Sequence, residues 1–154
     1  MDPNLLKSLK ALLTNPVAAL GTLHEGAPFV SMVPVAAAEA GLIIHVSGLA
    51  THTRDLRMDP RISLLFTAPL NAETDPLALP RVTLLGEAQE LDRNTPDYDR
   101  AATTYLARFP QAEQTLGLGD FSFFLLRPSS GRLVAGFGRA LSLGTREILQ
   151  ALPR

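Results

Sequence analysis

The stretch HVSGLATHTRDLRMDPRISLLF, residues 45–66, decides how this chain folds. Its first residues complete an apolar run, 41–47, that is typical of a buried strand. Residues 51–58 are long enough for two helical turns, and Pro60 ends that helix because a proline has no backbone N–H to donate. Residues 61–68 are again apolar and strand-like. The stretch therefore predicts two strands joined by one short helix.

Further strands are expected on both sides of this stretch. The apolar runs that predict them are 17–23, 28–35, 81–91, 121–128 and 132–143. Gly86, inside the third of these runs, indicates a bulge or the close approach of another backbone. Helices are expected at 2–14, with Asp2 as N-cap, after Thr95, and near the end at 145–152. Adjacent strands in small turns indicate a mainly β (α+β) antiparallel barrel forming one domain, 1–154.

The composition restricts the function of this domain. Its 154 residues are 46% hydrophobic and 19% charged, and a formal charge of −1 argues against a nucleic-acid-binding or polybasic membrane protein. The chain has no cysteine and only three scattered histidines (His24, His45 and His52), so no metal site is predicted. No apolar run reaches membrane length, and Lys7 and Lys10 lie in a helical pattern unlike a signal peptide. We therefore expect a cytoplasmic protein.

The short helix at 51–58 is a possible phosphate site. The start of a helix offers unpaired backbone N–H groups and the positive end of its dipole. Thr51 and Thr53 add hydroxyl groups, His52 adds an imidazole, and Arg54 and Arg57 add positive charge. The alternative is that Thr51 caps the helix and that both arginines are solvated.

Other residues give weaker indications of function. Arg81 begins a strand directly after a proline, where its guanidinium could point inward or lie on the surface. The run Gly136-Phe137-Gly138 suits either a bulge or a surface for a flat ligand. No glycine-rich phosphate loop and no nucleophile elbow are present, so no catalytic residue is identified. His45 alternates with strand residues and is expected to be a core or interface histidine rather than a ligand.

Together with the N-terminal helix, four segments resemble one known family. They are GAPFVSMVPVA at 26–36, VSGLATHTRDLRMDPRISLLF at 46–66, DPLALPRVTLLGEAQEL at 75–91, and DFSFFLLRPSSGRLVAGFGRA at 120–140. In this order they resemble the pyridoxamine 5'-phosphate oxidase-like family of FMN-binding split β-barrels, in the branch related to haem-utilisation proteins. The resemblance implies an antiparallel, Greek-key-like split barrel with a few peripheral helices, and a homodimer with FMN at the subunit interface.

The resemblance also implies a set of FMN-binding residues. These are Ser31, Val33, Pro34, Val46, Ser47, Thr51, His52, Thr53, Arg54, Arg81 and Phe137. Strand residues 31–34 would run along the isoalloxazine, residues 46–47 would line the ribityl chain, and residues 51–54 would hold the phosphate. Arg81 would face the flavin ring, and Phe137 would come from the other subunit.

The function implied first is an FMN-dependent oxidoreductase acting on a small molecule. Pyridoxamine phosphate is not its expected substrate, because the Arg-Leu-His type motif of the oxidases is replaced by GFGRA at 136–140. The alternative is a haem- or flavin-binding protein of the haem-utilisation type without turnover, with one of the three histidines as axial ligand. Haem is the less expected cofactor because haem-degrading relatives usually extend into a further C-terminal domain. A third possibility is a dimeric interaction module that has lost its cofactor.

Overall fold

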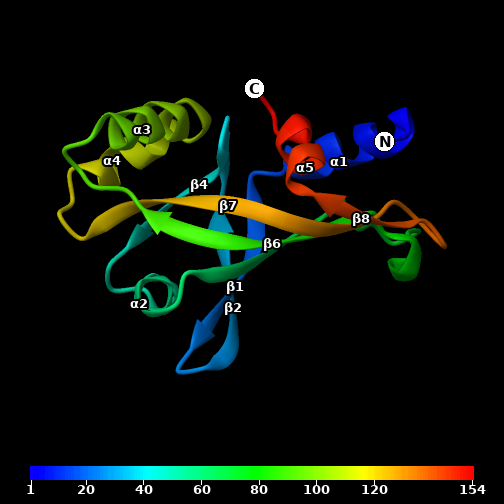
Figure 1. Ribbon diagram of the computed structural model, residues 1–154, viewed down its shortest axis with the longest axis horizontal. Coiled ribbons are helices and arrows are strands. Elements are labelled where there is room, and N and C mark those ends of the chain that lie inside the picture. Colours follow the sequence, from blue (N-terminus) through cyan, green and yellow to red (C-terminus); the bar gives the residue numbers. More distant parts are fainter.

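The computed structural model describes residues 1–154, which form one strongly curled antiparallel sheet with helices around it (Figure 1). The strands are β1 (Val17–His24), β2 (Ala27–Pro34), β3 (Ala36–Ala38), β4 (Gly41–Ser47), β5 (Arg61–Thr67), β6 (Arg81–Glu90), β7 (Phe121–Val134) and β8 (Ala140–Gly144). They pair in the order β2-β1-β5-β6-β7-β4-β3, and β8 adds to β7. The path does not return to its first strand, so the sheet is a half-barrel, as expected for a split barrel.

Five α-helices accompany the sheet, and the predicted ones lie where the sequence placed them. They are α1 (Pro3–Leu13), α2 (Thr51–Met58), α3 (Pro96–Arg108), α4 (Glu113–Leu116) and α5 (Thr145–Ala151), with 3-10 turns at Pro76–Ala78 and Pro110–Ala112. The side chains of Asp2 and Thr95 cap α1 and α3 by accepting backbone N–H bonds. No helix of the chain is long and apolar enough to cross a membrane.

The predicted strand 132–143 is wrong. Residues 121–134 form one long strand, β7, and a turn at 135–139 separates it from β8. The reason is that β7 has a different neighbour along each half of one edge: β4 pairs with 121–126 and β8 pairs with 130–134. Its other edge pairs with β6 between residues 124 and 134. Pairing with β6 and β8 on its two edges continues the strand through residues 130 and 131, inside the break that the sequence suggests at 129–131.

The predicted irregularity at Gly86 is confirmed. The register between β6 and β7 shifts between Leu85 and Gly86. A Cβ atom on Gly86 would lie 2.0 Å from the carbonyl oxygen of Arg127, so only glycine allows this approach. The extra residue of this bulge is Ser129 of β7, and a bulge bends its strand and increases the local twist of the sheet.

Two apolar clusters stabilise the fold. The larger one, of 23 buried residues, fills the concave side of the sheet and includes α1 and α5 through Leu9 and Ile148. The smaller one joins α3 to β4 and β7 through Ile43, Tyr105 and Phe123. Helix α2 belongs to the larger cluster only through Leu56 and otherwise meets the β1–β2 hairpin with polar side chains. That polar contact forms the site described next.

Candidate functional site

Helix α2 and the β1–β2 hairpin are joined by three side-chain hydrogen bonds. The Thr22 hydroxyl donates to Asp55 Oδ2 at 2.9 Å, and His24 Nδ1 lies 2.7 Å from Asp55 Oδ1. Ser31 Oγ lies 3.0 Å from His52 Nδ1. Strand alternation places Thr22, His24 and Ser31 on the face of the hairpin that meets α2. The sequence therefore positions two imidazoles at this contact.

Asp55 is the centre of this polar contact. It is only 4% exposed, and each of its carboxylate oxygens has a partner. A buried carboxylate is tolerated when both oxygens accept hydrogen bonds. Neither Asp55 nor Thr22 was predicted from the sequence. The only sequence signal for Asp55 is that it follows His52 by three residues and so lies on the same face of the helix. Which hairpin residues face that side of the helix depends on strand pairing and is not visible in the sequence.

The N-terminus of α2 has no side-chain cap. Its N-cap residue is Ala50, and Thr51 is the first helical residue, so the alternative in which Thr51 caps the helix is not what the structure shows. The Thr53 hydroxyl is fully buried and donates to the Ser47 carbonyl at 2.5 Å. Arg54 is exposed. The first backbone N–H groups of the helix are therefore not satisfied by side chains.

The loop before α2 is held to the turn before β7 through Asp120. Ser47 Oγ donates to Asp120 Oδ2 at 3.0 Å and accepts from the backbone of Leu49 at 3.1 Å. The Gly48 amide donates to the Asp120 carbonyl at 2.5 Å. These bonds fix the approach of the chain to the N-terminus of α2.

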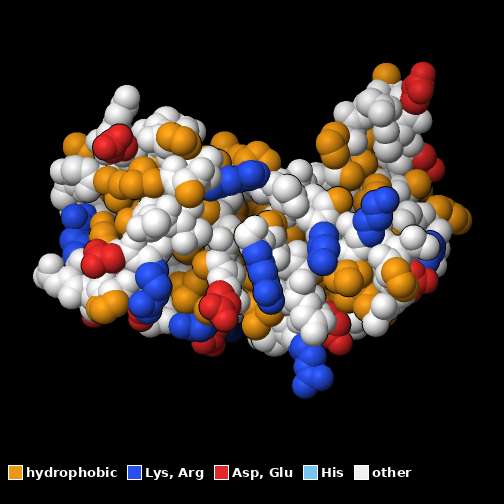
Figure 2. Space-filling model, turned by 90° about the horizontal axis from the view of Figure 1, so that it is seen from above, with side chains coloured by type: hydrophobic (Ala, Val, Ile, Leu, Met, Phe, Trp, Pro, Cys, Tyr) orange, Lys and Arg blue, Asp and Glu red, His pale blue; other side chains and the backbone are white.

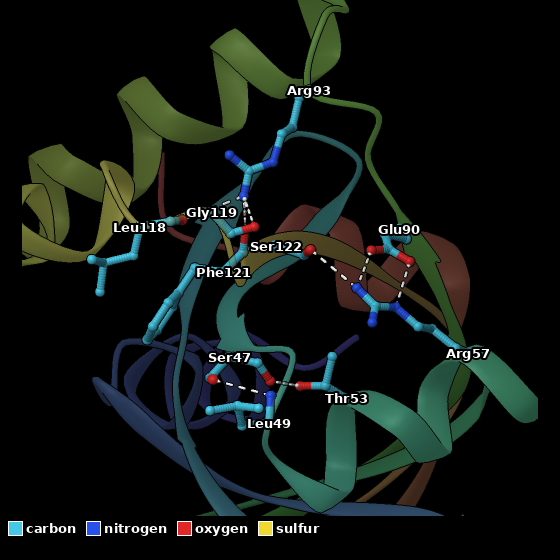
Figure 3. Close-up of polar contacts among 10 residues, drawn as sticks. All are labelled: Ser47, Leu49, Thr53, Arg57, Glu90, Arg93, Leu118, Gly119, Phe121 and Ser122. Carbon is cyan, nitrogen blue, oxygen red and sulfur yellow. Dashed lines mark hydrogen bonds and ion pairs between the residues drawn. The ribbon is translucent and has the colours of Figure 1, made fainter.

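Two arginines near this loop are already paired (Figure 3). Arg57 forms a two-point contact with the Glu90 carboxylate, at 2.7 and 3.0 Å, and also donates to Ser122. This pairing lowers the pKa of Glu90 and raises that of Arg57. Arg93 donates to the carbonyl oxygens of Leu118, Gly119 and Phe121. Both guanidiniums therefore brace the fold rather than point to an open phosphate site.

The structure brings together some of the residues expected to bind FMN and separates others. Ser31, Ser47 and residues 51–54 belong to the hairpin, the loop and the helix just described. Val33 and Val46 are 1% and 4% exposed, so their side chains lie in the core, whereas Pro34 is exposed.

Arg81 and Phe137 lie at another part of the sheet. Arg81 begins β6, whose far end, roughly 30 Å along the strand, carries the Glu90 that pairs with α2. The Arg81 guanidinium donates to the carbonyl of Leu79 at 2.9 Å. Phe137, 78% exposed, is in the turn that follows β7, whose last residue, Val134, pairs with Arg81. Arg81 and Phe137 are therefore near one another.

His45 is a core residue, as expected. It is 7% exposed and stacks on Phe123 with 4.3 Å between ring centroids. Its Nε2 has no hydrogen-bond partner. Burial, with a smaller effect of the Arg93 charge, lowers its pKa to about 4. The imidazole is therefore neutral and enclosed by aromatic rings.

One face of the sheet is apolar and uncovered. Met32 and Leu65 are both direct partners of Ala19, one on each side, so they share a face. The large apolar side chains exposed on this face of β1, β2, β5 and β6 are Val17, Val30, Met32, Leu65 and Leu85. An exposed apolar surface of this kind marks an interaction site.

A separate hollow of about 1000 Å³ lies between α3, β3 and the last residues of the chain. Figure 2 faces this side, where Lys and Arg side chains border a depression between α3 and α5. None of the residues expected to bind a cofactor lines it. No cluster of three or more His, Asp or Glu side chains suited to a metal ion is present.

Three relatives are informative. The chain is 37% identical to the chloroplastic haem oxygenase HOZ of Arabidopsis thaliana over 125 residues, and 26% identical to the haem oxygenase HutZ of Vibrio cholerae over 126 residues. These matches cover 80% and 81% of the chain, and 36% and 72% of the two relatives. The structure of a haem-binding protein from Mycobacterium smegmatis superposes with a TM-score of 0.86 at 32% identity, over 97% of this chain and 62% of that one.

The chain therefore spans about a third of the Arabidopsis relative and under two thirds of the mycobacterial one. The family model described as pyridoxamine 5'-phosphate oxidase matches residues 5–135, which include every strand from β1 to β7. The half-barrel architecture, the order of the segments and this match agree. The chain belongs to the pyridoxamine 5'-phosphate oxidase family.

Proposed function

We propose that this protein binds haem along the edge strand β2, beside α2. The observation that carries the proposal is an open apolar strand next to imidazoles. Six of the eight β2 residues are exposed, among them Phe29, which lies on the same face of the hairpin as His24 and Ser31. The His24 ring lies 5.8 Å from the Phe29 ring, and His52 contacts Ser31 of the same strand. Haem needs an apolar surface for its macrocycle and a nitrogen ligand for its iron, and these residues supply both.

The relatives support haem over the FMN-dependent oxidoreductase expected first. The two matching curated proteins are named as haem oxygenases, and the mycobacterial structure is of a haem-binding protein. We propose haem binding alone and assign no turnover to this chain. Haem supplies iron redox chemistry when bound, whereas the residues of this chain orient it and shield it from water.

FMN is the second candidate, and the uncapped start of α2 favours it. The free backbone N–H groups there, with the Thr51 hydroxyl and the exposed Arg54, would hold a phosphate. The Thr53 hydroxyl would not contribute while it donates to Ser47. This arrangement retains the phosphate site inferred from the sequence but assigns it mainly to the backbone.

A second copy of the chain would complete either site. On one copy the β2 edge is open to solvent, and the apolar sheet face beside it is uncovered. Pairing of two such faces would bury these side chains and would let Arg81 and Phe137 of one copy approach α2 of the other. A homodimer with the cofactor at its interface is therefore part of the proposal.

Parallel titrations of cofactor-free protein with ferric haem and with FMN test this function. The expected result is saturable haem binding at one equivalent per chain, with a shifted Soret band, and weaker FMN binding. Tight FMN binding without a haem spectrum would show that the cofactor is FMN and not haem. Failure to bind either cofactor would leave the interaction-module reading.

A further inference from the structure

The Asp55 carboxylate accepts a hydrogen bond from one ring nitrogen of His24 and thereby determines the protonation of the other nitrogen. A carboxylate can only accept, so the 2.7 Å contact requires a proton on His24 Nδ1. In the neutral ring Nε2 then carries the lone pair. The second oxygen of Asp55 accepts a hydrogen bond from the Thr22 hydroxyl at 2.9 Å, so both carboxylate oxygens are held in place. The His24 tautomer is therefore set by a rigid, buried partner.

The two side chains differ strongly in exposure. The Asp55 side chain is 5% exposed, whereas that of His24 is 45% exposed. A buried carboxylate that orients a half-exposed imidazole is the usual arrangement behind histidine metal ligands, where the second hydrogen bond fixes the ring and raises its basicity. His24 therefore has the features of a ligand for an incoming metal centre.

The other two histidines lack this arrangement. His45 is enclosed by aromatic rings, so its Nε2 has no access to a macrocycle. His52 contacts a serine hydroxyl, which can donate or accept, so its tautomer is not fixed. Burial also lowers the pKa of His52, with Asp55 opposing the effect. Among the three imidazoles, His24 alone has a carboxylate on Nδ1 and a half-exposed ring.

We propose that His24 ligates the haem iron through Nε2 and that Asp55 is its positioning residue. The inference rests on the proposed haem binding and adds the identity of the ligand. The iron–nitrogen bond forms from the Nε2 lone pair, and the Nδ1 proton stays in the hydrogen bond to Asp55. Phe29, beside the His24 ring, supplies apolar contact for the macrocycle.

The Asp55 contact also sets the iron redox preference. A hydrogen bond from Nδ1–H to a carboxylate increases electron donation from the imidazole, which stabilises ferric over ferrous iron. The site is therefore tuned to hold ferric haem. Exchange of the carboxylate for a neutral amide should make the one-electron reduction potential more positive.

The test uses ferric haem added to the cofactor-free protein and to the His24→Asn variant. Asparagine keeps an N–H donor for Asp55 but removes Nε2, so the fold keeps its buried hydrogen bond. We expect haem affinity to fall at least tenfold and the imidazole-type absorption and EPR signals to disappear. Added imidazole should restore these signals.

Two further variants separate the ligand from its surroundings. Asp55→Asn should retain haem with a more positive potential, measured by dithionite titration. Its matched control, Asp59→Asn, alters a carboxylate that pairs with Arg61 instead, and should leave the potential unchanged. In His52→Asn the imidazole-type signals should persist.

The outcomes distinguish the inference from the proposed function. If the unaltered protein binds no haem, the proposed function fails and the ligand assignment fails with it. If the unaltered protein binds haem and His24→Asn keeps the same spectrum and affinity, only the ligand assignment is overturned. Loss of the signals in His52→Asn instead would move the ligand to His52 and contradict the proposal.

Discussion

At the scale of single residues, the site depends on one buried charge. Asp55 receives hydrogen bonds from two residues of β1, Thr22 and His24, and thereby ties α2 to the hairpin. Loss of either donor would leave a carboxylate oxygen buried without a partner, which costs about 1–3 kcal/mol. The same contacts that fix the fold here also orient the imidazole, so stability and function share these residues.

His45 makes stability depend on pH. Burial lowers its pKa from an ordinary 6.5 to about 4, so between these values the unfolded chain binds more protons than the folded one. The free energy of unfolding should therefore fall as the pH decreases from 6.5 towards 4, by up to about 3 kcal/mol from this residue.

Urea unfolding at several pH values measures this effect. A His45→Phe variant keeps an aromatic ring against Phe123 and removes the titrating group. Its unfolding free energy should change less with pH than that of the unaltered protein, and the difference isolates the imidazole. Identical pH profiles for the two proteins would show that His45 does not carry the dependence.

At the scale of elements, the sequence predicted the limits of the helices, because these depend on residues that are close in sequence. An N-cap followed by a proline defined the start of α1 and of α3, and Pro60 limited the end of α2. Residues 51–53, which we expected to hold a phosphate, lie on the predicted helix α2. The hydrogen-bond partners of His52 and Asp55 come from the β1–β2 hairpin, which is distant in sequence. The length of β7 was missed for the same reason, because pairing with β4 and β8 determines it.

Gly86 provides a test of the bulge between β6 and β7. A Gly86→Ala variant would place its Cβ 2.0 Å from a backbone carbonyl oxygen, which cannot move aside as a side chain could. We expect the free energy of unfolding to fall by about 2 kcal/mol or more. Gly117→Ala is the matched control, because nothing lies within 4 Å of its Cβ and its φ of −77° suits alanine. Equal denaturation midpoints for both variants would contradict the close approach at Gly86.

At the scale of the whole molecule, the curled sheet has an interior filled by α1 and α5 and an apolar outer face over β1, β2, β5 and β6. The sequence predicted the barrel and its family from the order of its segments. It could not predict this outer face, because register across three strand pairs decides which side chains share it. The dimer was expected from resemblance, and this face provides a physical reason for it.

A charged side chain introduced on that face tests the proposed dimer. Met32 is 66% exposed on the apolar surface, and a Met32→Asp variant should convert the proposed dimer to monomers because the introduced charge would be desolvated at the interface. Sedimentation velocity measures the mass. Leu118→Asp, at an exposed position outside this face, is the control and should remain dimeric. A dimeric Met32→Asp variant would place the interface elsewhere.

The most direct test of haem binding is the cofactor content of protein purified from haem-supplied cells. Alkaline pyridine treatment converts bound haem to a chromophore of known absorbance, and heat-released FMN is quantified in the same sample by fluorescence. We predict about one haem per chain and little FMN. Flavin near one equivalent without haem, or protein that carries neither cofactor, would contradict the account.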